Sequence, residues 1–300
     1  MTCYHPLAAW RAVGQRTEAG KVPVVFARPS GPAEEIKVAC GQCIGCRLAR
    51  SKDWALRCVH EASLYEDNCF VTLTYDDDHL PPDGSLVKDD HQTFMRRLRK
   101  RFPVKKIRFF MCGEYGDSTM RPHYHFLLFN HDFWDKTEWM VSKGNTIFRS
   151  EELEKLWVNG YSWIGAVTWQ SAAYVARYVL KKVNGEHAWK RYCRDVDLDS
   201  GECRLLEPEY ICMSRRPGIA HAWYERYRSD CDKDYLTDHG RKYRVPRYYD
   251  QILELEDVEK YRSKKARRKE VAKATAKTPE RLATLKRAQE LAAKRLKRSL

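Results

Sequence analysis

Residues 107–129 have the sequence IRFFMCGEYGDSTMRPHYHFLLF, and this stretch decides the fold that we predict. Two apolar, aromatic segments, 107–114 and 123–129, are separated by a short polar loop that contains glycine and proline. Such segments favour β-strands, and strands joined by so short a connection pair in the antiparallel direction. Because side chains alternate between the two faces of a strand, His123 and His125 lie on the same face. The stretch therefore predicts an antiparallel pair of strands that presents two imidazoles together.

The two histidines have the spacing of metal ligands on a strand. Glu114 ends the preceding strand, so antiparallel pairing brings its carboxylate beside the start of the next one. Two imidazoles and one carboxylate leave open coordination positions on Mg²⁺ or Mn²⁺, as binding of a phosphate oxygen requires. Asp76, Asp77 and His79 are alternatives for the third ligand. The competing hypothesis is that the histidines stabilise the core and that Glu114 is a solvated strand end.

The flanking sequence predicts the rest of an α+β domain. Residues 69–75 are β-branched and aromatic and predict a further strand, and residues 201–213 suggest a hairpin. Apolar residues at helical spacing predict helices over residues 47–65, 89–102, 150–157, 171–183 and 223–228. We therefore expect an α+β fold with a central antiparallel sheet of about five strands, flanking helices and a basic helical C-terminal tail.

Paired tyrosines follow the histidines in the sequence. Tyr174 and Tyr178 are four residues apart in a predicted helix, so both lie on one face, and Lys181 and Lys182 continue that side. A tyrosine hydroxyl has a pKa of about 10 and becomes a better nucleophile beside a cation, which Lys181 or a metal ion could supply. With 17 tyrosines in the chain, a core-facing aromatic stripe is the alternative. Together with the metal ligands, however, the tyrosines indicate attack on a phosphate.

The eleven cysteines favour reduced thiols or metal ligation over a disulfide framework, because their number is odd and no signal peptide precedes them. Cys40, Cys43 and Cys46 are three residues apart, which is the least expected spacing in the sequence. With Cys3 or Cys58 they could complete a tetrahedral, structural Zn²⁺ site in a loop-rich module. Plain reduced thiols and an iron–sulfur cluster are the alternatives.

The formal net charge of +14 is unevenly distributed. Residues 260–300 contain 16 lysines and arginines against 3 glutamates, so the preceding 259 residues are almost neutral. The excess indicates a polyanionic partner that the tail binds without sequence preference. A weak oligomerising seam through Leu282 and Leu285 is the alternative for the tail. Further candidate DNA contacts are Arg177, Lys182, Arg215 and Arg216.

These patterns divide the chain into four segments. We expect an N-terminal cysteine-containing module at 1–60, a catalytic core at 61–190, an extension of that core at 191–250 and a basic helical or partly disordered tail at 251–300. The start of the chain does not resemble a signal peptide, and no apolar run is long enough to span a membrane. We therefore expect a cytoplasmic protein without a membrane partner.

The motifs resemble those of the HUH replication initiation proteins of microviruses, which are small single-stranded DNA phages, and most closely those of the gokushovirus branch. The resemblance spans nearly the whole chain. It rests on FVTLTYDDDHLP at 70–81, RPHYHF at 121–126, YVARY at 174–178 with Lys181, CGQCIGCR at 40–47 and SRRPGI at 214–219.

This resemblance implies an HUH endonuclease fold and a metal-dependent, site-specific single-strand endonuclease and strand transferase. One tyrosine would attack the origin DNA, leaving a 5′-phosphotyrosyl link and a free 3′-OH, and the second would allow the displaced strand to be rejoined. The implied partners are single-stranded origin DNA and the helicase and polymerase of the host, in the bacterial cytoplasm. A plasmid relaxase or transposase would use the same chemistry, and a nonenzymatic DNA-condensing protein would use the tail alone.

Overall fold

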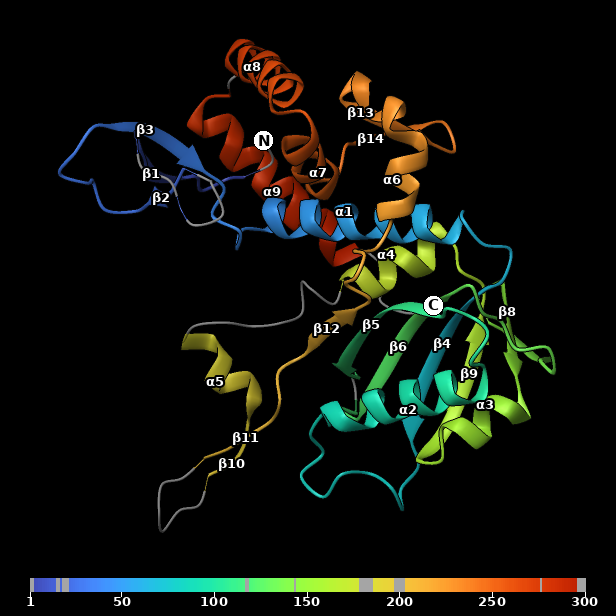
Figure 1. Ribbon diagram of the computed structural model, residues 1–300. Coiled ribbons are helices and arrows are strands. Elements are labelled where there is room, and N and C mark those ends of the chain that lie inside the picture. Colours follow the sequence, from blue (N-terminus) through green and yellow to red (C-terminus); the bar gives the residue numbers. More distant parts are fainter. Residues whose placement is uncertain are drawn as a thin grey trace. The chain divides into compact units, whose positions relative to one another are not determined.

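The computed structural model of the chain describes residues 3–14, 17, 22–116, 119–142, 144–177, 186–196, 203–275 and 277–295 (Figure 1). Its largest element is a seven-stranded antiparallel sheet, in the order β12-β5-β6-β4-β9-β8-β7. The strands are β4 (Asn68–Tyr75), β5 (Arg108–Tyr115), β6 (Pro122–Phe129), β7 (Thr137–Ser142), β8 (Asn145–Arg149), β9 (Gly160–Gly165) and β12 (Tyr210–Met213). The α+β class and the antiparallel pairing predicted from residues 107–129 are confirmed.

The sheet has more strands than the five or so that we expected. β7 is largely exposed and lacks the alternation of apolar and polar residues that marks a half-buried strand. β8 and β9 are short, and glycines stand at both ends of β9. These three strands therefore carry weak local signals and join the sheet through pairing with β4 and with one another.

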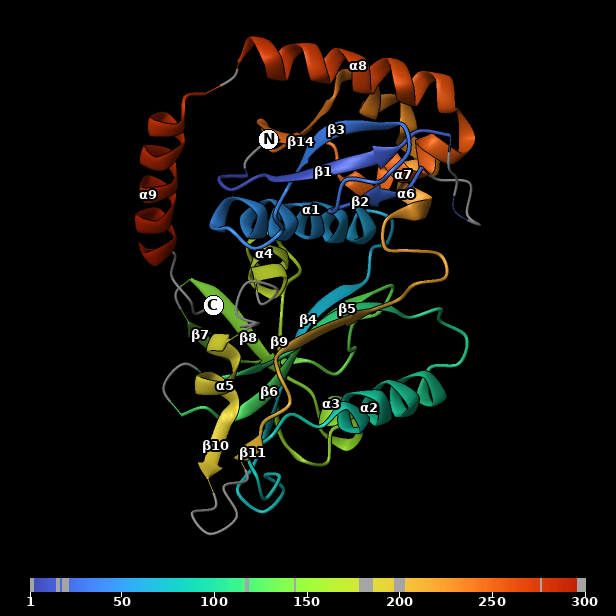
Figure 2. The same cartoon turned by 90° about the vertical axis from the view of Figure 1, so that its left-hand side faces the viewer.

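Helices cover both faces of the sheet (Figures 1 and 2). On one face lie α2 (Lys88–Arg101) and α3 (Glu151–Leu156), whose apolar residues pack with the strands in one hydrophobic core. On the other face lie α4 (Trp169–Arg177), α6 (His221–Tyr227), α7 (Arg247–Glu256) and residues 51–62 of α1 (Ile44–Ala62), which form a second core. The strands contribute alternate side chains to the two cores, so β5 is buried along its whole length.

Alternation along the strands decides which residues face α4. Phe126 of β6 packs in the core beneath α2, whereas Leu127 packs in the core beneath α4. His123 and His125 share the parity of Leu127 and therefore point to the α4 face. On β5, Cys112 belongs to the same core, so Glu114 also points to that face.

The segment between α4 and α6 differs from the prediction. It contains α5 (Glu186–Tyr192) and a two-stranded ribbon of β10 (Cys193–Val196) and β11 (Cys203–Leu205), which Figure 2 shows apart from the main sheet. The hairpin suggested for 201–213 is wrong, because β11 pairs with β10 while β12 pairs with β5. After α6 follow a 3₁₀ helix (Arg228–Lys233) and the hairpin of β13 (Tyr235–Asp238) and β14 (Arg241–Arg244).

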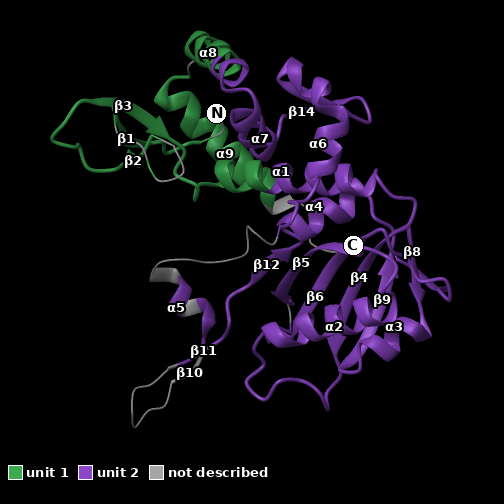
Figure 3. Cartoon of the chain, viewed as in Figure 1, with its two compact units in different colours: residues 1–50, 263–296 green, residues 51–262, 297–300 purple. Residues whose placement is uncertain are grey.

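The chain divides into two compact units (Figure 3). Unit 2 comprises residues 51–262 and 297–300 and contains the large sheet, whereas unit 1 comprises residues 1–50 and 263–296. Unit 1 holds a small antiparallel sheet of β2 (Val24–Val25), β1 (Leu7–Ala12) and β3 (Ala33–Val38), the start of α1, most of α8 (Val258–Ala274), and α9 (Pro279–Arg295). Of the described helices, none combines the length and the apolar character that crossing a membrane requires.

Candidate active site

The predicted metal ligands come from two adjacent strands of the sheet. Glu114 of β5 lies directly opposite His123 of β6 in the antiparallel register, and His125 lies opposite Cys112, two residues further along. All three side chains therefore project from the α4 face within reach of one another. One nitrogen of each imidazole and one carboxylate oxygen lie within 4.8 Å of each other.

The two imidazoles converge on a single carboxylate oxygen. Nε2 of His123 lies 2.6 Å from Oε1 of Glu114, and Nε2 of His125 lies 3.0 Å from the same atom. Burial raises the pKa of the Glu114 carboxyl, but the hydrogen bonds and charges of the two histidines outweigh it and lower the pKa to about 2. Glu114 is therefore an ionised carboxylate at neutral pH, as a metal ligand must be.

Second contacts orient both histidines. Nδ1 of His123 lies 3.1 Å from the carbonyl oxygen of Arg121, and because a carbonyl only accepts, this nitrogen carries the proton. Nε2 of His123 is then left with a lone pair for a metal ion. Nδ1 of His125 lies 2.9 Å from Oγ1 of Thr72, its register partner on β4. We did not predict Thr72 or Arg121 as part of the site.

The donor set fits a divalent metal ion. Adjacent donors on an octahedral Mg²⁺ ion are about 3.0 Å apart when each metal–ligand bond is about 2.1 Å. The 2.6 and 3.0 Å separations in the triad of Glu114, His123 and His125 are close to this value. Three protein ligands of this kind suit Mg²⁺ or Mn²⁺ with the remaining positions open to a substrate oxygen and water.

The alternative third ligands have other partners. Asp76 accepts a hydrogen bond from the backbone nitrogen of His79 and lies 2.7 Å from its ring, which closes a turn after β4. Asp77 pairs with Arg121 at 2.6 Å. Among the described residues, the cluster that contains His123 and His125 includes Glu114 and none of these three.

Helix α4 places one of the predicted tyrosines beside the triad. The Tyr174 hydroxyl donates to Oε1 of Glu114 at 3.5 Å, and its ring stands edge-on to His125, 5.1 Å between centroids. Thr168 and Ser171 fix the start of this helix, because each side chain accepts a hydrogen bond from the backbone nitrogen of the other. The cap and the half-buried ring together hold a hydroxyl next to the candidate metal position.

The other predicted site residues are not part of this geometry. Tyr178, Lys181 and Lys182 lie outside the residues that the structure describes. Arg177, at the end of α4, donates to the carbonyl of Ala173 in the preceding turn.

The basic pair at 215–216 lies away from the triad. Arg215 and Arg216 are exposed in the turn after β12. Ser214 at that end of β12 bonds Phe109, five residues before Glu114 on β5. Five residues of strand span about 17 Å, so the pair lies toward the opposite end of the sheet from the triad.

Two cavities flank the triad. His125 and Tyr174 line one of about 560 Å³, whose walls include the aromatic rings of Phe70, Phe148 and Trp163. His123 lines the other, of about 370 Å³, together with the polar residues Asp76, Asp77, Thr119 and Arg121. The triad therefore lies between an aromatic cavity and a polar one.

The fold and the site define an HUH-like α+β protein, with a His-x-His strand and a tyrosine helix on one face of an antiparallel sheet. Residues 68–183, which contain the triad and both tyrosines, match the family model of the replication-associated protein ORF2. The chain belongs to the family of phage replication-associated proteins, and the resemblance to microvirus initiators is confirmed.

Three relatives carry this assignment. The chain is 31% identical to replication-associated protein VP4 of Bdellovibrio phage phiMH2K, over 87% of this chain and 80% of the relative. It is 32% identical to replication-associated protein ORF2 of Spiroplasma virus 4, over 79% of this chain and 75% of the relative. It is also 32% identical to replication-associated protein ORF4 of Chlamydia phage 1, over 71% of this chain and 53% of the relative. No solved structure matches the chain significantly.

Proposed function

We propose that this protein nicks single-stranded origin DNA with a tyrosine nucleophile and so initiates rolling-circle replication. The observation that carries the proposal is the position of the Tyr174 hydroxyl, 3.5 Å from the Glu114 oxygen on which His123 and His125 converge. A phosphate bound at the triad would lie next to this hydroxyl, as attack on phosphorus requires. Membership of a family of replication-associated proteins supports the biological setting.

The reaction exchanges one phosphate ester for another. The Tyr174 oxygen loses its proton and bonds to phosphorus, while the bond from phosphorus to the 3′ oxygen breaks and that oxygen takes up a proton. The products are a 5′-phosphotyrosyl link and a free 3′-OH, so no external energy source is needed. A divalent ion bound by Glu114, His123 and His125 would supply positive charge to a phosphate oxygen.

The two cavities support a single-stranded substrate. Unpaired bases stack on aromatic side chains, and the 560 Å³ cavity with Phe148 and Trp163 has the size of a ligand pocket. Arg121 lines the polar cavity and can contact a neighbouring phosphate. In this proposal the DNA strand passes from one cavity to the other across the triad.

Tyr178 and Lys181 extend the proposal to strand transfer. Tyr178 would attack the regenerated origin after one round, and transfer between the two tyrosines would close the displaced strand into a circle. Lys181 would favour the ionised phenol, and Lys182 and Arg177 would contact the backbone of the DNA. The helicase and polymerase of the bacterial host, in its cytoplasm, would extend and displace the strand.

The test uses single-stranded oligonucleotides that tile the replicon encoding the chain, each labelled at either the 3′ or the 5′ end, with Mn²⁺ or Mg²⁺. A 3′ label should become covalently attached to the protein, whereas a 5′ label should appear on a shorter, free fragment. Tyr174→Phe should reduce the covalent product, and the double Tyr174→Phe/Tyr178→Phe variant should abolish it.

Tyr235→Phe, in β13, is the matched control and should cleave like the unchanged protein. If DNA binds but no covalent product forms with any oligonucleotide, the nuclease proposal fails and the tail-based DNA-binding hypothesis gains support. Full cleavage by the double variant would exclude the two tyrosines as nucleophiles.

A further inference from the structure

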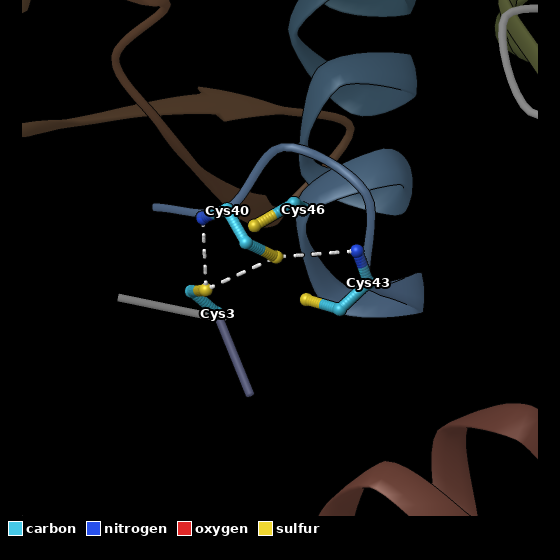
Figure 4. Close-up of side chains that lie close together, drawn as sticks. All are labelled: Cys3, Cys40, Cys43 and Cys46. Atoms are coloured by element: carbon cyan, nitrogen blue, oxygen red, sulfur yellow. Dashed lines mark hydrogen bonds between the residues drawn. The ribbon is translucent and has the colours of Figure 1, made fainter. Parts of the chain in front are cut away.

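Four cysteine side chains converge in unit 1, which does not contain the candidate nuclease site (Figure 4). The sulfur atoms of Cys3, Cys40, Cys43 and Cys46 all lie within 4.8 Å of one another, and those of Cys3 and Cys40 are 3.6 Å apart. Four sulfurs at about 2.3 Å from a tetrahedral Zn²⁺ ion would be about 3.8 Å apart. The four thiols therefore already surround a position of the right size for one ion.

The backbone near these cysteines brings the sulfurs together. Gly41 has a φ of +75°, a conformation that glycine adopts readily, and it allows the chain to turn between Cys40 and Cys43. Cys43 directly precedes α1, and its carbonyl accepts a hydrogen bond from the backbone nitrogen of Arg47. Cys46 lies in the first turn of the same helix, three residues on, and so faces the same side.

Backbone N–H groups point at three of the sulfurs. The nitrogen of Cys40 donates to the sulfur of Cys3 at 3.3 Å, and that of Cys43 donates to the sulfur of Cys40 at 3.3 Å (Figure 4). The nitrogen of Tyr4 donates to the sulfur of Cys43 at 3.4 Å. Such donors stabilise negative charge on sulfur, which suits thiolate ligands better than neutral thiols.

Unit 1 has little else to hold it together. Among its described residues, the buried side chains are Cys3, Ala9, Ala12 and Lys264, whereas larger apolar side chains such as Val24 and Phe26 are exposed. Both hydrophobic cores of the protein consist of residues from unit 2. A module with so little buried apolar surface needs a covalent or metal cross-link to remain folded.

We propose that Cys3, Cys40, Cys43 and Cys46 bind one structural Zn²⁺ ion as four thiolates. Zinc binding joins the start of the chain to the start of α1 and closes the loop that carries β1, β2 and β3. An iron–sulfur cluster fits less well, because several iron and sulfide atoms need wider separation of the cysteines than one ion does. The site is independent of the nuclease proposal.

The test measures metal in the full-length protein in a His123→Ala/His125→Ala background, which removes the other set of metal ligands. Mass spectrometry should find about one zinc per chain, and X-ray absorption should show sulfur neighbours at about 2.3 Å. Cys43→Ser, Cys46→Ser and Cys3→Ser should each lower the zinc content at least about tenfold. Cys212→Ser, a half-buried cysteine on β12 in unit 2, is the matched control and should keep the zinc.

Reconstitution keeps the proposal testable if the cysteine variants do not fold. The metal-free protein should take up one Co²⁺ per chain and develop the visible absorption of a tetrahedral tetrathiolate site, which added Zn²⁺ should remove. Three results would each overturn the proposal: failure to take up either ion, iron with inorganic sulfide in the purified protein, or nitrogen and oxygen neighbours around the zinc. Retention of zinc by Cys3→Ser would exclude Cys3 as the fourth ligand.

Discussion

The two clusters of candidate ligands are built in opposite ways. Glu114, His123 and His125 stand on paired strands of a sheet that has a hydrophobic core on each face. Cys3, Cys40, Cys43 and Cys46 come from the chain start, a turn and the beginning of a helix, in a unit with few buried side chains. In unit 2 the fold therefore positions the ligands, whereas in unit 1 we propose that the ligands and their ion hold the fold.

Charge separates the two units as well. Unit 1 has 19 lysines and arginines against 6 acidic residues, whereas unit 2 has 36 against 35. A nearly neutral unit gains little from long-range attraction to DNA, so its site must bind the strand by stacking and by specific contacts. The comparison suggests that unit 2 cuts DNA and unit 1 holds it without sequence preference.

The largest expected effect follows from His123→Ala. If the sheet positions the ligands, removing one should lower the cleavage rate on the order of 100-fold or more while the thermal unfolding temperature changes little. Rates are measured with 3′-labelled oligonucleotides and unfolding by circular dichroism. His239→Ala, an exposed histidine in the β13–β14 turn, is the control.

Two results would break the contrast between the units. Undiminished cleavage by His123→Ala would remove His123 from the metal site. A fall in unfolding temperature as large as that of Cys43→Ser would mean that the histidine supports the fold as much as the cysteine does. Binding of nonspecific DNA by His123→Ala should remain near that of the unchanged protein, because unit 1 is intact.

The sheet site could be predicted from sequence because its partners are local. The short loop between β5 and β6 leaves little freedom in register, so Glu114 opposite His123 follows from the strand pattern. The four-residue spacing of Tyr174 and Tyr178 predicts one helix face, and the fold brings Tyr174 to the triad. The nine free cysteines among the described residues agree with the preference for reduced thiols, while Cys193 is disulfide-bonded.

The supports of the site could not be predicted because they depend on distant pairings. Thr72 contacts His125 only because β4 pairs with β6, and Trp163 lines the aromatic cavity only because β9 pairs with β4. Neither pairing leaves a mark in the local sequence. The association of residues 1–50 with residues 263–296 is equally remote, although the spacing of Cys40, Cys43 and Cys46 signals a site within it.

A smaller effect, on stability, should sharpen the contrast at acidic pH. His60 in unit 2 stacks on Trp223 and lies 2.8 Å from the Tyr249 hydroxyl. Burial lowers its pKa from 6.5 to about 3, so between these values the unfolded chain binds a proton that the folded chain does not. Stability must therefore fall as the pH drops through this window, by about 2 kcal/mol at pH 5 relative to pH 8.

Urea unfolding at several pH values, followed by tryptophan fluorescence, measures this dependence. His60→Gln should flatten it by about 2 kcal/mol between pH 8 and pH 5, whereas the exposed His239→Gln should leave it unchanged. An unaltered pH dependence in His60→Gln would show that this imidazole does not set the acid stability of unit 2. The histidine of unit 1, His5, is exposed and should contribute little.

The smallest expected effect concerns the basic helices. Four exposed cations of unit 1 are replaced together, in the variant Lys273→Gln, Lys277→Gln, Arg281→Gln and Arg287→Gln. Each phosphate contact on single-stranded DNA contributes about 0.7 to the slope of log affinity against log salt, so the slope should fall by up to about 3. Affinity for a nonspecific oligonucleotide near physiological salt should fall roughly tenfold, as measured by fluorescence anisotropy.

The comparison depends on where the charge is removed, so the control takes the same four charges from the surface of unit 2. Its exposed positions are Lys106, Lys155, Arg241 and Lys242, each changed to Gln. If unit 1 holds the DNA, this control should keep most of the salt dependence, and both variants should cleave saturating DNA at the unchanged rate. An equal loss of slope in the two variants would mean that net charge, rather than the basic helices, governs binding, and holding DNA would then belong to the whole chain.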